Sequence, residues 1–385
     1  MDAPNHPTIT TKGVLRPTLV TVNLERLTQN YRAIQQHVGN SRVMPVLKAN
    51  AYGHGLVEVA RHMAGLGAPM LGVAFLEEGI LLREHGIQMP ILVMGGILGD
   101  QIPLFLEHDL GLAASSVEKL AQVDQAAEAR GVRARVHLKI DTGMERIGVH
   151  YYSAEALFEA SLACKHTDIE GVFSHFANAD AADLSSARLQ IERFEEALRF
   201  YERRSLPTPM RHMANSGAVL QLPESHYELV RPGILLYGVY PSNEVKRTIE
   251  VKPALRWTSR VVYFKVVKPG HPVSYGSTWE SDHLVRMVTI PVGYGDGYFR
   301  AMSNRAEVLL GGKRYPVVGR ICMDQFMVNI EWDSAYNGDE VVLVGESGDM
   351  RITVEDLANW ADTIPYEILT NINTRVPRVY VRSGE

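Results

Sequence analysis

The sequence has few of the features that would place it in a specialised class of protein. Only two of its 385 residues are cysteines, Cys164 and Cys322, which disfavours a disulfide-built secreted protein and favours a reducing compartment. No apolar run approaches the roughly 20 residues that span a bilayer. The N-terminal segment MDAPNHPTITTKGVLRP lacks the basic and apolar regions of a signal peptide. We therefore expect a soluble, cytoplasmic protein.

An excess of charge of one sign is also missing. The formal net charge of −5 gives no electrostatic footprint for nucleic acid or an anionic membrane, so neither is expected as a partner. The fourteen histidines form no His-Glu-x-x-His or other spaced ligand set, and we expect no metal site. A chain of 385 residues is longer than one hydrophobic core usually organises, which predicts two domains.

The first part of the chain alternates short apolar runs with helix-like segments. Eight runs are predicted as strands, at residues 43–48, 70–74, 90–94, 110–113, 134–139, 169–173, 209–213 and 227–230. Helical periodicity is clearest at 116–130, 153–164 and 185–204, each with a serine near its start that suits an N-cap. Eight strands alternating with helices predict an α/β protein with a (β/α)8 barrel over residues 12–240. The rival is an open doubly wound sheet, but the loop after the first strand lacks a G-x-G-x-x-G pattern.

The pattern changes after residue 240. Short strands are expected at 255–267, 287–291, 306–310, 315–318, 326–331 and 340–344, with turn pairs such as Gly311-Gly312 and Asn337-Gly338 between them. One helix, at 353–362, interrupts the series. Residues 241–385 are therefore predicted to form a second, mostly β domain.

Polar side chains gather where the predicted barrel strands end, which is where barrel enzymes place their active sites. Five of the eight strands contribute to this set, which comprises Lys48, Lys139, Asp141, Arg146, His175, His212, Asn215, Ser216 and Arg231. A single polar residue at a strand end would be ordinary. Five strands contributing to one rim predict an active site.

Lys48 ends a buried apolar strand, where an unpaired ammonium is too costly. Desolvation lowers the pKa of a lysine, and the neutral amine is the form that condenses with an aldehyde cofactor. A structural ion pair beneath the rim explains the position of Lys48 equally well.

The segment around Lys48, VLKANAYGHG at residues 46–55, resembles the pyridoxal-phosphate attachment segment of the alanine racemases, which are fold-type III pyridoxal-phosphate enzymes. Further motifs resemble that family in the same order along the chain, at Lys139–Gly148, Phe173–Ala177, His212–Ser216, Arg231–Ile234, Val273–Gly276, Gly319–Asp324 and Ile364–Glu367. One departure is Gly293-Tyr294-Gly295-Asp296-Gly297, where family members commonly have alanine in the middle. The resemblance covers nearly the whole chain and implies a TIM-type barrel followed by a β domain.

The resemblance implies an isomerase that interconverts L-alanine and D-alanine, either supplying D-alanine for peptidoglycan and the cell wall or catabolising it. Pyridoxal 5'-phosphate acts as the electron sink, and one acid–base group is needed on each face of Cα. Lys48 would serve one face and Tyr275 the other. A phenol needs a cationic or hydrogen-bonding neighbour to act as a base at neutral pH, and we expect His175 to belong to such a relay.

The resemblance also implies which residues bind the cofactor. Arg231 would face the pyridine nitrogen, leave it unprotonated, and so shorten the life of the carbanion. The phosphate would be bound at helix starts after the last two barrel strands and by two phenols. These residues are Asn215, Ser216, Gly233, Ile234, Tyr52 and Tyr366.

Arg146 and the backbone amide of Met323 resemble the family's contacts to the substrate carboxylate. Lys139 matches a position that is carbamylated in many family members, and an unmodified Lys139–Asp141 pair is the alternative. By the same resemblance the enzyme is a homodimer in which Tyr275 and Met323 complete the active site of the partner subunit.

Two other enzymes fit the same architecture. One is a racemase with another or broader amino-acid range, such as serine or lysine, since the sequence does not fix the volume of the pocket. The other is a basic-amino-acid decarboxylase, which typically has a carboxylate opposite the pyridine nitrogen and a cysteine as proton donor. Arg231 and Tyr275 disfavour it. A non-catalytic pyridoxal-phosphate carrier protein is usually a single barrel and would have no need of the β domain.

Overall fold

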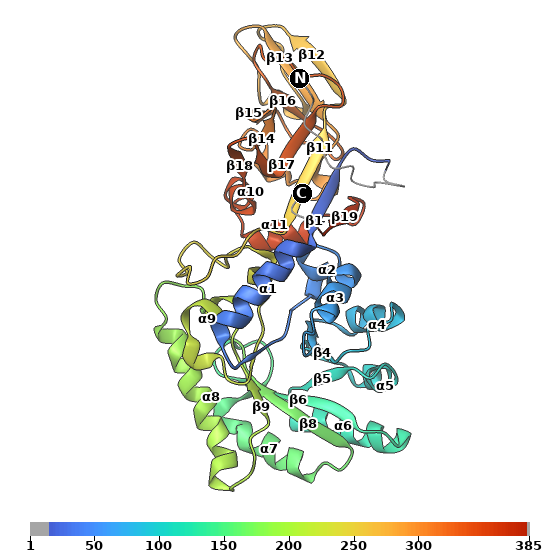
Figure 1. Ribbon diagram of the computed structural model, residues 1–385, viewed down its shortest axis with the longest axis vertical. Helices are drawn as coiled ribbons and strands as arrows, with labels where there is room; N and C mark the ends of the chain where they lie inside the picture. The colour runs from blue at the N-terminus through green and yellow to red at the C-terminus, as the bar shows by residue number, and fades with distance from the viewer. Residues whose placement is uncertain (1–14, 383–385) are drawn as a thin grey trace. The chain divides into compact units, whose positions relative to one another are not determined.

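The computed structural model describes residues 15–382, which form two compact units (Figure 1). We call residues 28–252 the barrel unit, and the described residues up to Leu27 together with those from Pro253 onward the β unit. The division falls within helix α1 (Leu24–Val38). Most of the segment in which we expected no signal peptide, and the expected start of the barrel domain at residue 12, lie outside the described residues.

The sheet of the barrel unit is parallel and closes on itself. Its main path runs β2-β10-β9-β8-β6-β5-β4-β3, and the short β7 pairs with β6. Val46, just beyond β2, bridges to Gly72 of β3, with Leu47 N donating to Gly72 O at 2.7 Å, so the two ends of the path are joined. The bounds are β2 Arg42–Val43, β3 Leu71–Val73, β4 Ile91–Val93, β5 Gly111–Ala114, β6 Ala134–Asp141, β7 Val149–His150, β8 Thr167–Phe173, β9 Met210–His212 and β10 Leu229–Val230. The predicted barrel is therefore confirmed. Each main strand overlaps a predicted run, although β2 shares only Val43 with the run predicted at residues 43–48.

Helices follow the strands in alternation, and Figure 1 shows α4 to α8 at the periphery of the strands of this unit. Their bounds are α2 Lys48–Tyr52, α3 Leu56–Gly65, α4 Leu76–Glu84, α5 Ile102–Glu107, α6 Val117–Arg130, α7 Ala154–Ala163, α8 Ser185–Arg203 and α9 Ser216–Gln221. Of the three expected serine N-caps only one is right. Ser116 Oγ accepts from Lys119 N at 3.0 Å, but Ser153 makes no such bond, and Ser185 is already the first residue of α8.

The β unit contains a sheet with the order β12-β13-β16-β15-β14-β17-β11-β1-β19, and β18 pairs with β17. The strands are β1 Leu19–Asn23, β11 Leu255–Arg260, β12 Tyr263–Val267, β13 Val285–Ile290, β14 Glu307–Leu310, β15 Lys313–Val318, β16 Phe326–Asn329, β17 Glu340–Ser347, β18 Met350–Ile352 and β19 Arg378–Val381. Two helices accompany them, α10 Val354–Ala361 and α11 Pro365–Asn371. Gly311 and Gly312, both with positive φ, form the two-residue turn between β14 and β15.

The observed division of the chain differs from the expected domain boundaries. We assigned residues 12–240 to the barrel, yet β1 pairs with β11 and β19 in the sheet of the β unit, and the barrel unit extends to Lys252. β1 has only five residues, and no predicted helix precedes it, so its own sequence does not indicate which sheet it joins. Only its long-range partners decide this.

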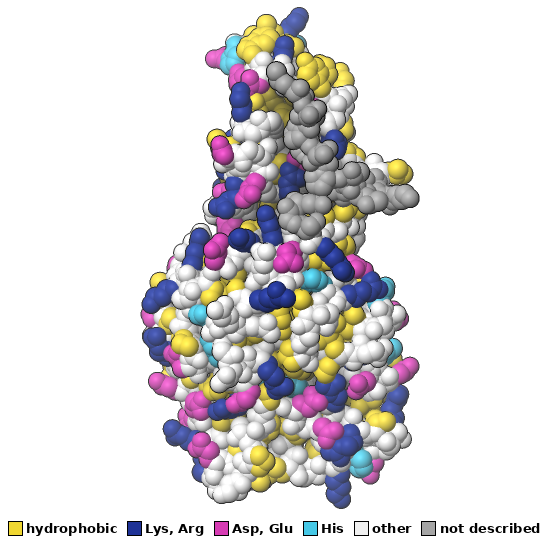
Figure 2. Space-filling model, viewed as in Figure 1, with side chains coloured by type: hydrophobic (Ala, Val, Ile, Leu, Met, Phe, Trp, Pro, Cys, Tyr) yellow, Lys and Arg dark blue, Asp and Glu magenta, His cyan; other side chains and the backbone are white. Residues whose placement is uncertain are grey.

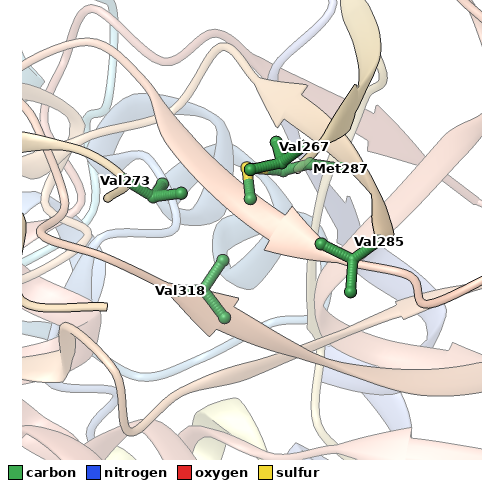
Figure 3. Packing of buried hydrophobic residues seen from close by; sticks show 5 residues of the cluster. All are labelled: Val267, Val273, Val285, Met287 and Val318. Carbon is green, nitrogen blue, oxygen red and sulfur yellow. The ribbon is translucent and has the colours of Figure 1, made fainter. Parts of the chain in front are cut away.

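A buried apolar cluster of the β unit includes Val273, two residues before Tyr275. Figure 3 shows Val273 beside Val267, Val285, Met287 and Val318, all less than a tenth exposed. Val273 N also donates to Trp279 O at 2.9 Å and closes the loop that contains Tyr275. The cluster therefore fixes the base of this loop.

Basic and acidic side chains are interspersed on the face drawn in Figure 2. None of the helices within residues 15–382 is long and apolar enough to cross a membrane.

Candidate active site

The segment after β2 turns sharply at Lys48. Ala49, Asn50 and Ala51 have φ between 53° and 55°, and Tyr52 has a φ of 50°, so four residues other than glycine form a left-handed helical turn. Each such residue costs about 1–2 kcal/mol relative to a right-handed one. Lys48 was expected to end a strand and instead begins this turn. Backbone strain of this kind is concentrated at functional sites.

Side-chain bonds hold the strained turn in place. Glu78 Oε1 accepts from Ala49 N at 2.6 Å, while its other oxygen accepts from Ala74 N at 2.8 Å. Asn50 Oδ1 accepts from Leu56 N at 2.8 Å. Glu78, on α4, thus ties the turn that follows Lys48 to the end of the neighbouring strand β3.

The surroundings of Lys48 favour its neutral form. Burial lowers the pKa of Lys48, and the charges of Arg146 and Arg231 lower it further, while Glu78 acts in the opposite direction. The structure therefore brings these cations together, as the sequence predicted. A neutral amine held at a fixed place is a nucleophile toward a carbonyl group and a base toward a carbon acid.

Arg231, just after β10, is buried and has only neutral partners. Its Nη1 lies 3.0 Å from His212 Nδ1, and its Nη2 lies 3.1 Å from His175 Nδ1 and donates to Ser174 O at 2.7 Å. Among residues 15–382 no carboxylate lies within ion-pair distance of it. Desolvation lowers the pKa of Arg231 to about 9. Burial lowers the pKa of His175, and the charge of Arg231 lowers it further.

Lys139, on β6, is only 3% exposed, and its Nζ donates to Ile140 O at 3.0 Å. Burial and the charge of Arg231 lower its pKa to about 7. The alternative Lys139–Asp141 ion pair is not formed among the described residues. Asp141 instead accepts from the backbone amides that follow it, including Gly143 N at 2.8 Å and Arg146 N at 3.2 Å. It shapes the loop that carries Arg146.

The starts of α9 and of the turn at Ile234–Tyr237 are joined by one hydroxyl. Ser216 Oγ accepts from Gly233 N at 3.0 Å and from Leu235 N at 3.3 Å, and Asn215 caps α9 by accepting from Ala218 N at 3.1 Å. A Cβ on Gly233 would lie 2.2 Å from Tyr52 Oη, so glycine is required for that close approach.

Tyr275 lies in the β unit and is 72% exposed. The preceding Ser274 has a φ of 65°, and its Oγ donates to Arg320 O at 2.6 Å. This bond and the buried Val273 orient the loop, while the phenol itself contacts no hydrogen-bond partner within the described chain. Tyr366, at the start of α11, is partly exposed.

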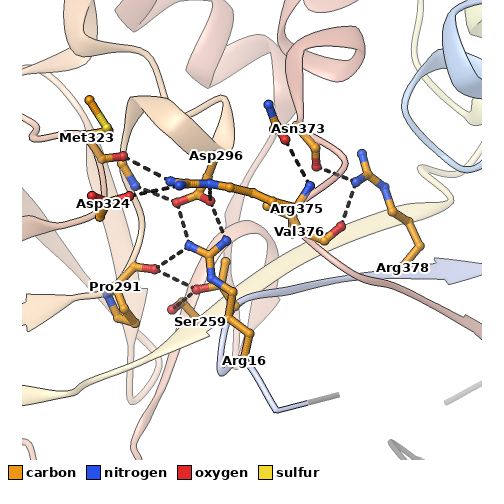
Figure 4. Close-up of polar contacts among 12 residues, drawn as sticks. Arg16, Ser259, Pro291, Asp296, Met323, Asp324, Asn373, Arg375, Val376 and Arg378 are labelled. Atoms are coloured by element: carbon orange, nitrogen blue, oxygen red, sulfur yellow. Dashed lines mark hydrogen bonds and ion pairs between the residues drawn. The ribbon is translucent and has the colours of Figure 1, made fainter. Parts of the chain in front are cut away.

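A second loop of the β unit carries Met323, which is 53% exposed, and is held by the group shown in Figure 4. Arg375 Nη2 donates to Met323 O at 3.2 Å, Arg375 Nη1 lies 2.9 Å from Asp324 Oδ1, and Arg375 Nε donates to Asp296 Oδ1 at 2.6 Å. Asp296 is fully buried and also accepts hydrogen bonds from both terminal nitrogens of Arg16. We call Arg16, Asp296 and Arg375 the carboxylate clamp.

The clamp also explains the unusual glycine in the Gly293–Gly297 segment. Gly295 N donates to Met323 O at 2.9 Å, and a Cβ on Gly295 would lie 2.5 Å from the guanidinium of Arg375. With glycine, the guanidinium can pack directly against this segment. Burial alone would raise the pKa of Asp296, but the bonds from Arg16 and Arg375 outweigh it and lower the pKa.

Comparison with known proteins assigns the chain to a family. The model described as "Alanine racemase, N-terminal domain" matches residues 22–241, and "Alanine racemase, C-terminal domain" matches residues 254–380. The chain belongs to the alanine racemase family. The "Alanine racemase" of Carboxydothermus hydrogenoformans is 46% identical over 369 residues, covering 95% of this chain and 100% of the relative. Family members interconvert L-alanine and D-alanine, and they depend on pyridoxal phosphate.

Solved structures of the family agree with the fold. The alanine racemase of Clostridium difficile is 34% identical, covers 97% of each chain and has a TM-score of 0.91. The alanine racemase of Bartonella henselae "with covalently bound pyridoxal phosphate" is 27% identical, covers 95% of this chain and 99% of that one, and has a TM-score of 0.86. The predicted family, the fold class and the class of enzyme, an isomerase, are therefore confirmed.

Several side chains that organise the Lys48 segment, Arg231 and the Met323 loop were not identified from the sequence. They are Glu78, which fixes the turn after Lys48, His137 and Glu170, which lie below His212, and Arg16 and Arg375 of the carboxylate clamp. None of them lies in the matched motifs. The buried carboxylate of Asp296 was within a motif we noted, but its partners are more than 70 residues away in the sequence.

Proposed function

We propose that Lys48 and Tyr275 are the two acid–base groups with which this chain interconverts L-alanine and D-alanine. The observation that carries the proposal is the place of Lys48, whose pKa is lowered by burial and by Arg146 and Arg231 at the rim of a closed barrel. A neutral lysine can both bind an aldehyde cofactor and accept a proton from Cα. Tyr275 would hold or release a proton on the opposite face.

The residues of the barrel unit fit pyridoxal phosphate. When bound, the cofactor supplies an electron sink for the pair of electrons left on Cα. Arg231 offers buried donors and has no carboxylate partner among the described residues, which suits an uncharged pyridine nitrogen. Tyr52 and Ser216, which both pack against Gly233, offer a phenol and a hydroxyl for a phosphate. We assign Asn215, Ile234, His175 and Tyr366 to the same cofactor site.

We assign the substrate carboxylate to Arg146 and to the backbone amide of Met323. Lys139 is a candidate for carbamylation because a lysine with a pKa of about 7 is about half free amine at pH 7, the form that reacts with carbon dioxide. A carbamate there would place a negative charge near Arg146 and orient it.

We further propose a homodimer in which Tyr275 and Met323 of one subunit complete the site of the other. Tyr275 is 72% exposed and Met323 is 53% exposed, which supports this proposal. A group that acts on Cα must be shielded from water when substrate binds, and the partner subunit would provide that cover. The cytoplasm is the proposed location. D-alanine for peptidoglycan is the proposed product, and catabolism of D-alanine is the alternative role.

The test is a chiral assay of the purified holoenzyme with L-alanine, and the expected product is an equimolar mixture of enantiomers. Serine and lysine are assayed beside it, and release of carbon dioxide from lysine would instead indicate the decarboxylase. Borohydride reduction should fix the cofactor to the peptide that contains Lys48. Recovery on the peptide of Lys139 or any other lysine would contradict the assignment of Lys48.

A further inference from the structure

A row of buried side chains runs from Arg231 toward the N-terminal ends of the barrel strands, below the groups assigned above. Arg231 Nη1 lies 3.0 Å from His212 Nδ1, and His212 Nε2 lies 2.8 Å from His137 Nδ1. His137 Nε2 faces Glu170 Oε2 at 3.5 Å, and Glu170 Oε1 accepts from Arg135 Nε at 2.8 Å. Both imidazoles are fully buried. We call Arg231, His212, His137 and Glu170 the histidine row.

Hydrogen-bond chemistry fixes one order of protons along this row. A guanidinium only donates, so His212 Nδ1 must be the acceptor and carry no proton. Burial, and next the charge of Arg231, hold the pKa of His212 well below its usual value, so this ring is neutral. Its proton is then on Nε2 and is donated to His137 Nδ1. The proton of His137, also a neutral ring, is left on Nε2.

The row ends at a carboxylate. Within the described chain His137 Nε2 makes no hydrogen bond of normal geometry, and the carboxylate oxygen that faces it is Glu170 Oε2 at 3.5 Å. Burial by itself raises the pKa of Glu170, but its contacts with His137 and Arg135 lower the pKa to about 2. Glu170 is therefore ionised and only accepts. Every donor in the row faces an acceptor in this order, and in no other.

Two irregularities of β8 make room for the row. Val136 pairs with Ile169 but His137 pairs with Gly171, so Glu170 is the extra residue of a β-bulge. A bulge re-aims a side chain, and this one brings Glu170 to His137. A Cβ on Gly171 would lie 2.5 Å from His137 Nδ1, so only glycine leaves space for the ring.

Phe173, on the same strand, stacks on His212 with the ring centroids 4.8 Å apart and an angle of 2° between the planes. The orientation of His212 is thus fixed by packing as well as by its two hydrogen bonds. The bulge, the glycine and the stacked phenylalanine ring therefore all help to position the side chains of the histidine row.

We propose that His137 and Glu170 are positioning residues for Arg231 and act through His212. They keep His212 Nδ1 free of a proton, so the guanidinium always finds an acceptor on that side and remains in one orientation. Neither residue touches the substrate. The inference rests on the proposed function, in which Arg231 faces the pyridine nitrogen.

The first test replaces His137 in two ways. His137→Gln keeps the direction of the row, since its carbonyl can accept from His212 and its amide group can donate to Glu170. His137→Leu has no polar atom and breaks the row. We expect kcat for alanine to fall about fivefold to tenfold in the leucine variant, the effect of one net hydrogen bond, and to recover largely in the glutamine variant.

The second test removes the charge at the end of the row. Glu170→Gln should lower kcat about threefold, because a neutral acceptor makes roughly half the bond of a charged one. The matched control is Asp168→Asn on the same strand, whose carboxylate pairs with Arg133 outside the row. It should keep the wild-type kcat.

The proton order is measured directly in the holoenzyme labelled with 15N-histidine. We expect two neutral rings protonated on Nε2, and a His212 signal that changes in His137→Leu. A His212 ring protonated on Nδ1, or wild-type kcat in both His137→Leu and Glu170→Gln, would overturn the inference. A wild-type protein that does not racemise alanine would contradict the proposed function instead, and the 15N spectrum would still decide the proton order.

Discussion

Burial is the first cause of a lowered pKa for two lysines of the barrel unit, but their side chains differ in how much of them remains exposed. Lys48 is partly exposed at the rim, where a ligand can reach it, whereas Lys139 is 3% exposed on β6. The pKa of about 7 for Lys139 has burial as its first cause, followed by Arg231. A buried cation without a carboxylate partner opposes folding, because the unfolded chain hydrates the charge fully.

The pH dependence of stability should report this burial. The pKa of Lys139 falls from 10.5 in the unfolded chain to about 7 on folding, so between these values the unfolded state binds the extra proton. The contribution of Lys139 to the free energy of unfolding therefore rises with pH from about 7 to about 10.5. Lys139→Met should stabilise the protein at pH 7, by at most ~5 kcal/mol, and the gain should fade as the pH rises.

Urea unfolding in carbon-dioxide-free buffer measures this difference, since carbamylation would change the charge at Lys139. Lys119→Met on α6 is the control, because among the described residues the partly exposed Lys119 side chain is hydrogen-bonded only to Gln122. A gain from Lys139→Met that is constant between pH 7 and pH 10 would contradict the assigned cause.

At the scale of elements, the loop with Met323 depends on a segment far from it in the sequence. Arg375, shortly before β19, contacts both Met323 and Asp324, and Asp296 holds Arg375 (Figure 4). Arg16 binds the same Asp296 but also Pro291 O rather than the Met323 loop. The two arginines therefore share an anchor but differ in what they orient.

Replacing each arginine separates these two roles. Arg375→Lys removes the forked contact to Met323 and Asp324, and we expect the KM for alanine to rise about tenfold, with a smaller change in kcat. Arg16→Lys weakens the hold on Asp296 without touching Met323, so it should lower the melting temperature and leave KM unchanged. Equal changes of KM in both variants would show that the loop does not depend on Arg375 in particular.

The same elements show how far the sequence predicts the structure. The barrel strands were found because buried parallel strands leave short apolar runs, and the site because its polar residues follow those runs. β1 and β19 were missed, since strands of five and four residues give little periodic signal. The histidine row was missed because His137 and Glu170 look like ordinary strand residues until the bulge brings them together.

The left-handed turn after Lys48 was missed for a related reason. Asn50 tolerates positive φ, but Ala49 and Ala51 have no local preference that could outweigh its cost. The conformation is imposed by Glu78 and by the strand ends around it. Local propensity predicts what a segment prefers, and long-range bonds decide where a functional site overrides that preference.

At the scale of the whole molecule, the two proposed bases lie in different units. Lys48 belongs to the barrel unit, and Tyr275 to the β unit, where it is largely exposed. If each site is completed by the partner subunit, the interface is symmetric and both chains use the same two surfaces. A defect in one unit can then be compensated by an intact copy of that unit on the other chain.

Mixing two inactive variants tests this arrangement. Lys48→Ala and Tyr275→Phe homodimers should each be inactive. In a mixed dimer one site combines the intact lysine of one chain with the intact tyrosine of the other, while the second site lacks both. Random exchange makes half of the dimers mixed, and half of their sites intact, so activity should recover to about one quarter of wild type.

The matched control mixes Lys48→Ala with Arg231→Ala, two defects in the same unit. Every site in that mixed dimer contains one damaged barrel, so no activity should return. Subunit exchange is verified by mass spectrometry of differently labelled chains. Exchange without recovery in the first mixture, or a fully active monomer, would refute the shared site, whereas recovery in both mixtures would show that the variants do not inactivate through the residues replaced.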